Sequence, residues 1–475
     1  MKILFAASEA VPFIKTGGLA DVAGSLPKAL AQAGHEVKVI LPLYEGIGDQ
    51  WRSQMTFLKY FNVTLSWRQV YCGLFQLERE GVTYWFVDNE YYFKRWQIYG
   101  HFDDCERFAY FSRAVVESMG WLNWHPDVLH CNDWHTAMLP MLLRTQYGYY
   151  VHGKIKTLLT IHNIFYQGKF GFDFFRDLLR VEDRYFTSEF MELNGCAAFM
   201  KAGCVFADRL NTVSPSYAEE ICTPYYGEGL DGILSARRHQ LSGILNGIDK
   251  KVFNPYTDQL IAKRYDKGHL KGKQVCKESL MFDMGLQGDA RTPLIAMVSR
   301  MTDQKGFDLV ERVLDEMMDF DICFLLLGSG NGEYENFMRE AENRHRGRVC
   351  AYIGYNEELS HRVYAGADML LMPSRFEPCG LSQMIAMRYG TLPIVRETGG
   401  LRDSVIPYNQ YTGEGTGFSF TNYNAHEMKD AVERAVHVYR EQPEVWTGLM
   451  RNAMAADFGF ERSAEEYARL YIDIL

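Results

Sequence analysis

Short apolar runs rich in Val, Ile and Leu alternate with stretches of helical period along most of the chain. Such alternation is typical of βαβ units built on a parallel sheet. A first series predicts strands over residues 2–8, 36–42, 84–89, 127–131, 156–161 and 209–213. A second series predicts strands over residues 294–299, 322–327, 349–353, 368–372 and 392–395. The pattern therefore predicts an α/β protein with two doubly wound sheets.

Helical period is clear in residues 19–33, 105–119 and 460–475. The last of these stretches is amphipathic, and from its pattern alone it could pack on either lobe. Between the two series of strands, residues 243–258 combine Asn-Gly and Asn-Pro turns. This segment is predicted to cross from one lobe to the other, with the hinge near Asn246.

Size and composition agree with two lobes of an ordinary soluble enzyme. The chain has 475 residues, whereas single cores usually stop growing at about 250 to 300 residues. Apolar residues make up 47% and charged residues 23%. A net charge of -10 argues against a protein that grips nucleic acid, and no apolar run approaches the roughly 18 residues of a membrane span. Ten scattered cysteines without a CxxC pair predict reduced thiols in the cytoplasm.

The first strand is followed by Lys15-Thr-Gly-Gly, which leads directly into a predicted helix. Ligands of open α/β sheets bind outside the carboxyl ends of the strands, and a helix N-terminus favours an anion. Lys15 ahead of the glycines and Asp21 behind them favour a diphosphate site, although a tight turn for close packing remains the simpler alternative. The G-x-G-x-x-G fingerprint of dehydrogenases is absent from this turn, which weakens a nicotinamide interpretation.

Two cations follow the first strand of the second lobe. Arg300 comes directly after Ser299, and Lys305 follows five residues later in Asp303-Gln-Lys-Gly. Each cation held about 4 Å from a phosphate charge stabilises that charge by on the order of a few kcal/mol. A solvated pair is the alternative, but Lys305 at a helix start would oppose the helix dipole unless an anion lay nearby. The two residues therefore predict binding of a leaving diphosphate.

The string Pro373-Ser-Arg-Phe-Glu377-Pro-Cys-Gly380-Leu381 follows another strand and leads into a helix. A carboxylate at Glu377 can bind sugar hydroxyls or offset positive charge on an anomeric carbon. Backbone amides near Gly380 and Leu381 can bind phosphate oxygens. A lone Glu before a helix would usually be a cap, but the complete string is more specific than that.

Polar residues also follow two strands of the first lobe. Asn132-Asp133-Trp134-His135 follows one strand and His162-Asn163 follows the next. The carboxyl ends of neighbouring strands meet at one edge, so these side chains are predicted to point into one site. Trp134 is expected to offer a flat face to a sugar ring. His162 taken alone could equally be a histidine at a strand end whose hydrogen bonds are satisfied within the protein.

A metal site is not predicted. His130, His135 and His162 have no zinc-ligand spacing. The DxD string Asp319-Phe-Asp321 precedes its predicted strand, which places it at the wrong end of the sheet. Arg300 and Lys305 are expected to neutralise the diphosphate in place of a metal ion.

Taken in order, these strings make the chain resemble the ADP-glucose-dependent glycogen and starch synthases, a branch of the GT-B glycosyltransferases. The resemblance runs from end to end and rests on strings that start at Lys15, His130, Thr160, Leu245, Ser299, Pro373 and Arg396. It implies two Rossmann-like domains facing across a deep cleft, with the C-terminal helix returning to the N-terminal domain. Residues 1–244 with 457–475 would form the acceptor-side domain, and residues 245–456 the nucleotide-sugar domain.

The resemblance implies a reaction as well as a fold. Glucose would pass from ADP-glucose to the non-reducing 4-hydroxyl end of an α-1,4-glucan, with retention and release of ADP. The acceptor would be glycogen or a maltooligosaccharide, and no cofactor, nucleic acid or membrane partner is expected. The residues leave open whether the donor carries ADP or UDP, and they do not specify an oligomeric state.

Site residues carried over from the resemblance fall into two groups. The catalytic group is Glu377, Arg300, Lys305, His162 and Asp133. The substrate-binding group is Lys15, Gly18, Asp21, Trp134, Asn163, Asn246, Tyr355, Cys379, Gly380 and Leu381. Lys15 and Gly18 would approach the diphosphate from the opposite lobe, His162 and Asn246 would hold the donor sugar, and Tyr355 would lie beside adenine. Asp21, Asp133 and Trp134 would belong to the acceptor side.

Two positions depart from the family pattern. Many retaining relatives carry a second glutamate eight residues after the first, where this chain has Ile385. Near the hinge the family commonly has Trp before Asn-Pro, where this chain has Phe253. Because position 385 is an isoleucine, no second carboxylate is assigned.

Three alternatives stay open at this point. A neighbouring GT-B enzyme, such as a sucrose or lipid glycosyltransferase or a nucleotide-sugar epimerase, would use a different donor or acceptor. A glucan-binding scaffold with a degraded site would bind glycogen without consuming donor, although the retained Lys15, Arg300, Lys305 and Glu377 argue against it. A dehydrogenase would bind a nicotinamide cofactor.

Overall fold

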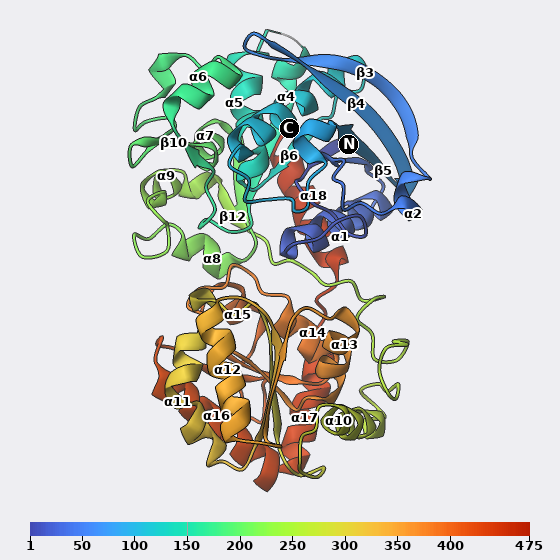
Figure 1. The fold of residues 1–475 in the computed structure, drawn as a ribbon, viewed down its shortest axis with the longest axis vertical. Helices are drawn as coiled ribbons and strands as arrows, with labels where there is room; N and C mark the ends of the chain where they lie inside the picture. The colour runs from blue at the N-terminus through green and yellow to red at the C-terminus, as the bar shows by residue number, and fades with distance from the viewer. Residues whose placement is uncertain (150) are drawn as a thin grey trace. The chain divides into compact units, whose positions relative to one another are not determined.

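A computed structural model describes residues 1–149 and 151–475. The described residues form two compact units (Figure 1). Unit 1 comprises Met1–Gly247 with Phe460–Leu475, and unit 2 comprises Ile248–Gly459. The chain leaves unit 1 directly after Asn246 and Gly247, close to the expected hinge.

The central sheet of unit 1 has the order β12-β11-β7-β6-β1-β2-β5-β4-β3. Its strands are β1 Lys2–Ala6, β2 Glu36–Pro42, β3 Thr56–Leu65, β4 Arg68–Arg79, β5 Val82–Asp88, β6 Val128–Asn132, β7 Lys156–Ile161, β11 Arg209–Thr212 and β12 Leu241–Gly243. The strands from β12 to β5 pair in parallel, and β3 and β4 add an antiparallel hairpin at one edge (Figure 1). The chain turns back between β1 and β6, which is the switch point of this sheet.

The six strands expected in the first lobe are confirmed to within a few residues. A smaller sheet, with the order β8-β10-β9, lies outside the main one and consists of β8 Lys169–Phe170, β9 Glu192–Leu193 and β10 Cys196–Ala198. The helices of unit 1 are α1 Gly18–Gln32, α2 Asp49–Arg52, α3 Glu90–Phe93, α4 Asp104–Trp121, α5 Met138–Thr145, α6 Phe172–Leu179, α7 Phe199–Phe206, α8 Pro215–Glu220, α9 Asp231–Ala236 and α18 Phe460–Ile474.

Helix α18 belongs to unit 1 and lies beside α1 (Figure 1). Its buried residues recur at helical spacing, so one apolar face packs into the core: Phe460, Ala464, Tyr467, Leu470, Tyr471 and Ile474. Two tyrosines on this face also make polar contacts. Tyr471 Oη lies 2.7 Å from His130 Nδ1, and Asn211 Nδ2 donates to Tyr467 Oη at 2.7 Å. The sequence pattern left the packing partner of this helix open, and the structure settles it.

The sheet of unit 2 has the order β15-β14-β13-β16-β17-β18, and every neighbouring pair is parallel. Its strands are β13 Leu294–Val298, β14 Cys323–Gly328, β15 Val349–Ile353, β16 Met369–Met372, β17 Leu392–Arg396 and β18 Phe418–Phe420. The chain moves outward from β13 to β15, returns to the other side of β13, and moves outward again. This is the doubly wound Rossmann order, with its switch point between β13 and β16.

Helices cover both faces of this sheet (Figure 1). They are α10 Lys271–Asp283, α11 Phe307–Met318, α12 Gly332–Arg344, α13 Glu357–Gly366, α14 Ser382–Arg388, α15 Gly399–Ser404, α16 Ala425–Glu441 and α17 Pro443–Ala455. The five strands expected in the second lobe are confirmed, and β18 is an addition. The predicted class, two doubly wound α/β domains of the GT-B type, therefore describes the fold.

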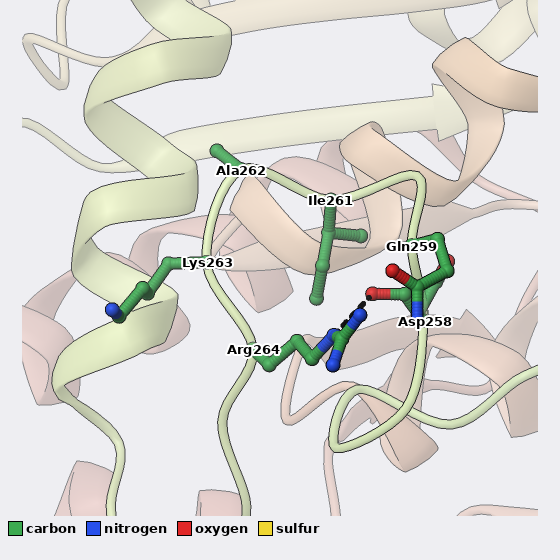
Figure 2. A pocket seen from close by; sticks show the side chains of 6 residues that line it. All are labelled: Asp258, Gln259, Ile261, Ala262, Lys263 and Arg264. Carbon is green, nitrogen blue, oxygen red and sulfur yellow. Dashed lines mark hydrogen bonds between the residues drawn. The ribbon is translucent and has the colours of Figure 1, made fainter.

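Residues 249–270 begin unit 2 without a helix or strand and pack on the rest of that unit through a buried carboxylate. Asp258 Oδ2 accepts a hydrogen bond from Tyr389 Oη at 2.5 Å and lies 2.7 Å from His361 Nδ1. Burial alone would raise the pKa of Asp258, but these hydrogen bonds outweigh it and lower that pKa. Figure 2 shows a hollow that this segment lines, where Arg264 Nε donates to Asp258 O at 3.3 Å. The residues that line it are not those of the predicted site.

Candidate active site

The turn after β13 and the turn after β16 meet at the switch point of unit 2. Lys305 Nζ lies 2.6 Å from Glu377 Oε2. Ser374 Oγ donates to the same carboxylate oxygen at 2.9 Å, and Glu377 is only 5% exposed. Lys305 and Glu377 are thus in direct contact. The sequence predicted them as a cation and a carboxylate that bind one ligand.

Arg300 lies two residues beyond the end of β13 and is exposed. Among residues 1–149 and 151–475, no side chain forms an ion pair or hydrogen bond with its guanidinium. The structure therefore places Arg300 and Lys305 on the same strand-end turn, but it joins only Lys305 directly to Glu377.

Glycines let the three strand-end turns of unit 2 pack closely. Gly306 has a φ of 75°, and a Cβ there would lie 2.2 Å from the carbonyl oxygen of Pro373. Gly399 has a φ of 45°, and its Cβ would lie 2.0 Å from the carbonyl oxygen of Glu377. Gly400 N donates to that same carbonyl at 3.1 Å. The backbone of Glu377 is therefore held by the turn after β17, in a space where no side chain fits.

The turn between Glu377 and α14 is held by an internal side chain. Gln383 Nε2 donates to the carbonyl oxygens of Cys379 at 3.0 Å and Gly380 at 2.9 Å. Gly380 adopts a φ of 72°, and Cys379 is buried. Gly380 and Leu381 thus lie in a fixed turn immediately ahead of α14.

Tyr355 lies apart from this cluster. It follows β15, which is separated from β13 by β14, and its side chain is 77% exposed. The order of strands puts the Tyr355 turn at the edge of the sheet. An aromatic face is available there, but the structure records no hydrogen bond that joins it to Lys305 or Glu377.

In unit 1, Asp133 joins the ends of β6 and β7. Asp133 Oδ1 accepts hydrogen bonds from the backbone amides of His162 at 2.7 Å and Asn163 at 3.3 Å. Its own backbone has a φ of 56° and a ψ of -176°, a region that costs a non-glycine residue about 1–3 kcal/mol. Burial raises the pKa of Asp133 from 3.8 to about 7, against the opposing effect of the two amides. Strain and a displaced pKa at one residue are features of functional sites.

His162 is a buried, neutral imidazole. Its Nε2 lies 2.9 Å from Asn132 Oδ1, and Asn132 Nδ2 donates to the carbonyl oxygens of Ala6 and His130. Because the amide nitrogen of Asn132 is a donor to two carbonyls, Oδ1 faces the histidine and Nε2 of His162 carries the proton. Burial lowers the pKa of His162 to about 3, so the ring is uncharged at neutral pH.

The expected role of Trp134 needs correction. Its side chain is only 8% exposed, and its ring packs against Phe108, Phe170 and Phe199 with centroid distances of 5.0 to 5.9 Å. A Cβ on Gly168 would lie 2.3 Å from the same ring. A sugar ring therefore has no open face of Trp134 to stack on. Trp134 is a core residue that supports the Asp133 turn.

The Lys15 turn leads into α1, which begins at Gly18. Lys15 Nζ lies 2.8 Å from Asp21 Oδ1, so the predicted cation and carboxylate are joined. Glu9 was not predicted as a site residue; it is 3% exposed and accepts hydrogen bonds from Thr16 and Gly17. Its only sequence signal is a carboxylate three residues beyond a strand end.

Asn246 lies at the end of unit 1 and is 6% exposed. Its Oδ1 has no hydrogen-bond partner among the described residues. A buried amide oxygen without a protein partner carries a desolvation cost, which a hydroxyl group of a bound sugar would relieve.

Two of the three histidines named for a possible metal site, His130 and His162, have protein hydrogen-bond partners. His130 lies 2.7 Å from Tyr471 Oη through Nδ1 and 2.7 Å from Thr160 Oγ1 through Nε2. In the part of the chain that the structure describes, no group of three His, Cys, Asp or Glu side chains is arranged to hold a metal ion. Asp319 and Asp321 precede β14, at the end of the sheet opposite Lys305 and Glu377, as predicted.

Comparison with known proteins identifies the class. A family model described as "Starch synthase catalytic domain" matches residues 2–236, and one described as "Glycosyl transferases group 1" matches residues 286–447. The chain is 51% identical to the glycogen synthases of Geobacillus thermodenitrificans and Geobacillus stearothermophilus, over 100% of this chain and 98% of each relative.

A solved structure agrees with these relatives. The catalytic domain of starch synthase IV from Arabidopsis thaliana, bound to ADP and acarbose, has a TM-score of 0.93 and 32% identity, with 99% of both chains covered. A sucrose-phosphate synthase from Thermosynechococcus elongatus, at 17% identity and a TM-score of 0.61, shares the fold. Two doubly wound units with polar switch points thus define a GT-B glycosyltransferase. The chain belongs to the family of bacterial glycogen synthases and plant starch synthases.

Proposed function

We propose that this chain transfers glucose from ADP-glucose to the non-reducing 4-hydroxyl end of an α-1,4-glucan, with retention of configuration and release of ADP. The contact of Lys305 Nζ with Glu377 Oε2 at 2.6 Å carries the proposal. Breaking a sugar–diphosphate bond develops negative charge on the diphosphate and positive charge on the anomeric carbon. A cation and a carboxylate fixed side by side match those two charges.

Unit 2 supplies the groups for the donor. The ammonium group of Lys305 has three N–H donors, so it can keep Glu377 and also bind a phosphate oxygen. Arg300 adds a second, exposed positive charge on the same turn. Amides in the fixed turn at Cys379, Gly380 and Leu381 are proposed to bind further phosphate oxygens, and the exposed ring of Tyr355 to contact adenine.

Unit 1 supplies neutral and weakly acidic groups for sugars. His162 with Asn163, held by Asp133, and the buried amide of Asn246 are proposed to bind hydroxyl groups of glucose. Lys15 and Gly18 are proposed to contact the donor diphosphate, and Asp21 the acceptor. The acceptor is proposed to be glycogen or a maltooligosaccharide.

Retention is proposed to proceed on one face of the sugar. Glu377 offsets charge on an oxocarbenium-like state, while the glucan hydroxyl enters where ADP leaves. Ile385 stands in α14 where many retaining relatives have a second carboxylate, so no second nucleophile is assigned. Arg300 and Lys305 supply the positive charge that the departing diphosphate needs, and the proposal invokes no metal or cofactor.

The described part of the chain contains no helix long and apolar enough to cross a bilayer. It includes all ten cysteines, and none of them forms a disulfide. We place the reaction in the cytoplasm, where thiols stay reduced.

The direct test is to incubate the purified protein with glycogen and ADP-glucose, or with glycogen and UDP-glucose, each labelled in the glucose and each in the presence of EDTA. We expect label in the polymer from ADP-glucose, and its release by an enzyme that cleaves only α-1,4 bonds. Glycogen binding without incorporation from either donor would indicate a glucan-binding scaffold instead. Label that depends on added metal would contradict the assigned role of the two cations.

A further inference from the structure

Glu9 is a buried carboxylate with no role in the reaction assigned so far. It lies between β1 and α1, at the switch point of unit 1, and is 3% exposed. A charged side chain is rarely buried this far unless it has polar partners. Its partners therefore indicate what it does.

All of its recorded hydrogen bonds come from the Lys15 turn. The oxygen Oε2 accepts from Thr16 N, from Thr16 Oγ1 at 2.9 Å and from Gly17 N at 3.3 Å. These donors lie between Lys15 and Gly18, the first residue of α1. A backbone bridge between Ala10 and Ile14 closes the same loop on its other side. One carboxylate oxygen thus fixes the chain directly after Lys15.

This geometry changes the expected use of the helix N-terminus. The sequence predicts that the free amides at the start of this helix bind a diphosphate. In the structure, the amides of Thr16 and Gly17 bind the chain's own carboxylate, which is the anion that the start of α1 favours. Of the groups of this turn proposed for the donor diphosphate, the side chain of Lys15 and the amide of Gly18 are the ones that Glu9 does not use.

The charges around Glu9 make its placement costly. Burial raises the pKa of Glu9, the donors of Thr16 and Gly17 lower it, and the charge of Asp21 raises it further. The charge of Glu9 in turn helps to raise the pKa values of Asp133, Tyr44 and Tyr99. An amide side chain would keep one acceptor oxygen at a lower desolvation cost. Its hydrogen bonds to Thr16 and Gly17 would lack the negative charge that makes those of a carboxylate stronger.

We propose that Glu9 is a positioning residue that fixes the turn after Lys15 and so aims the Lys15 ammonium group at the donor diphosphate. The inference rests on the proposed function, because it assigns Lys15 to the donor. It predicts that Glu9 acts on donor binding through Lys15 and has little effect on the glucan acceptor.

A double-mutant cycle tests this directly. We compare wild type, Glu9→Gln, Lys15→Gln and the double variant for KM of ADP-glucose, KM of glycogen and kcat. Glu9→Gln is expected to raise KM for ADP-glucose about tenfold, to leave KM for glycogen within about twofold, and to add little in the Lys15→Gln background. Additive effects, or an unchanged KM for ADP-glucose, would overturn the proposal.

Asp208 provides a matched control. Its Oδ2 accepts from Thr157 N at 2.7 Å and Thr157 Oγ1 at 2.8 Å, a similar set of contacts at the amino ends of β7 and β11 in the same sheet. The same oxygen also pairs with Arg144 Nη2 at 2.5 Å. Asp208→Asn is expected to lower Tm without changing KM for ADP-glucose. If Glu9→Gln does not fold, Thr16→Val removes only the hydroxyl donor and is expected to raise the same KM about threefold. An unchanged KM in a folded Thr16→Val would then overturn the proposal.

Equilibrium binding of ADP to the four proteins of the cycle separates this inference from the proposed function. A wild type that binds ADP but transfers no glucose would contradict the function. The Kd values for ADP would then decide the role of Glu9. Glu9→Gln is expected to bind ADP more weakly than wild type, but only when Lys15 is present. Equal Kd values for wild type and Glu9→Gln would overturn it.

Discussion

Two carboxylates show how a single residue can join separate turns. Glu377 accepts from Lys305 and Ser374 through one oxygen, and Asp133 accepts the amides of His162 and Asn163 through one oxygen. Each therefore brings residues from two strand ends to one place. Glu9 instead binds Thr16 and Gly17 within its own loop between β1 and α1.

Asp133 gives a stability prediction with a definite sign. Its pKa is about 7 in the folded protein against an ordinary value of 3.8, so protonation favours folding. The stability that Asp133 contributes is fully present below pH 3.8 and is lost as the pH rises through 7. The unfolding free energy of Asp133→Asn, relative to that of wild type, should therefore rise by up to about 4 kcal/mol between pH 4 and pH 8.

Denaturant unfolding at a series of pH values measures this difference. Asn keeps an oxygen for the His162 amide, and Asp208→Asn serves as a control in the same unit. A difference between Asp133→Asn and wild type that stays constant from pH 4 to pH 8 would contradict the raised pKa.

The sequence predicts most single residues of the site but not all their roles. Lys305 and Glu377 could be paired in advance because strand ends of one sheet converge. Trp134 could not be assigned, because exposure depends on Phe108, Phe170 and Phe199, which come from distant helices and strands. Glu9 was missed because a lone carboxylate near a strand end has no motif.

At the scale of elements, the predicted strands were those buried on both faces of a parallel sheet. Such strands are short apolar runs bounded by turns, which a pattern detects easily. The hairpin β3–β4 was missed because its strands are antiparallel, half exposed and rich in polar residues, with a register shift between Phe57 and Lys59. Helix α18 was predicted, but its packing partner depends on contacts with His130 and Asn211.

The close packing of strand-end turns gives a prediction at this scale. Gly399→Ala places a methyl group 2.0 Å from the carbonyl oxygen of Glu377, at a φ of 45°. We expect it to lower the unfolding free energy by about 3 kcal/mol and turnover by more than tenfold, because the Glu377 backbone must move.

Gly448→Ala is the matched control, since a Cβ at Gly448 meets no atom within 4 Å and the residue lies inside α17. It should raise stability by about 0.5–1 kcal/mol and leave turnover unchanged. Normal turnover in Gly399→Ala would show that the position of Glu377 does not depend on this turn.

For the whole molecule, the chain ends in the unit where it begins. Helix α18 completes the core of unit 1, so folding of that unit requires residues from both ends of the sequence. The two units otherwise have separate cores and separate sheets. This organisation predicts that changes in α18 act on the stability of unit 1.

Tyr471→Phe tests that prediction. It removes the hydroxyl that lies 2.7 Å from His130 Nδ1 and leaves that buried nitrogen unpaired. The unfolding free energy should fall by about 1–2 kcal/mol, measured by denaturant titration. Tyr256→Phe, at a side chain that is 64% exposed, should change it by less than about 0.5 kcal/mol. Equal effects in the two variants would contradict the role of α18.

Arg300 and Lys305, at the switch point of unit 2, are proposed to stabilise the departing diphosphate. The measurement is kcat for transfer from ADP-glucose to glycogen in Arg300→Ala and Lys305→Ala, with Arg312→Ala as the control. Arg312 is an exposed cation on α11 that pairs with Glu316, so its loss leaves the site intact. We predict a fall of about a hundredfold or more in each of the first two variants and no change in the third. Near-normal kcat in either Arg300→Ala or Lys305→Ala would show that the departing diphosphate does not need that cation.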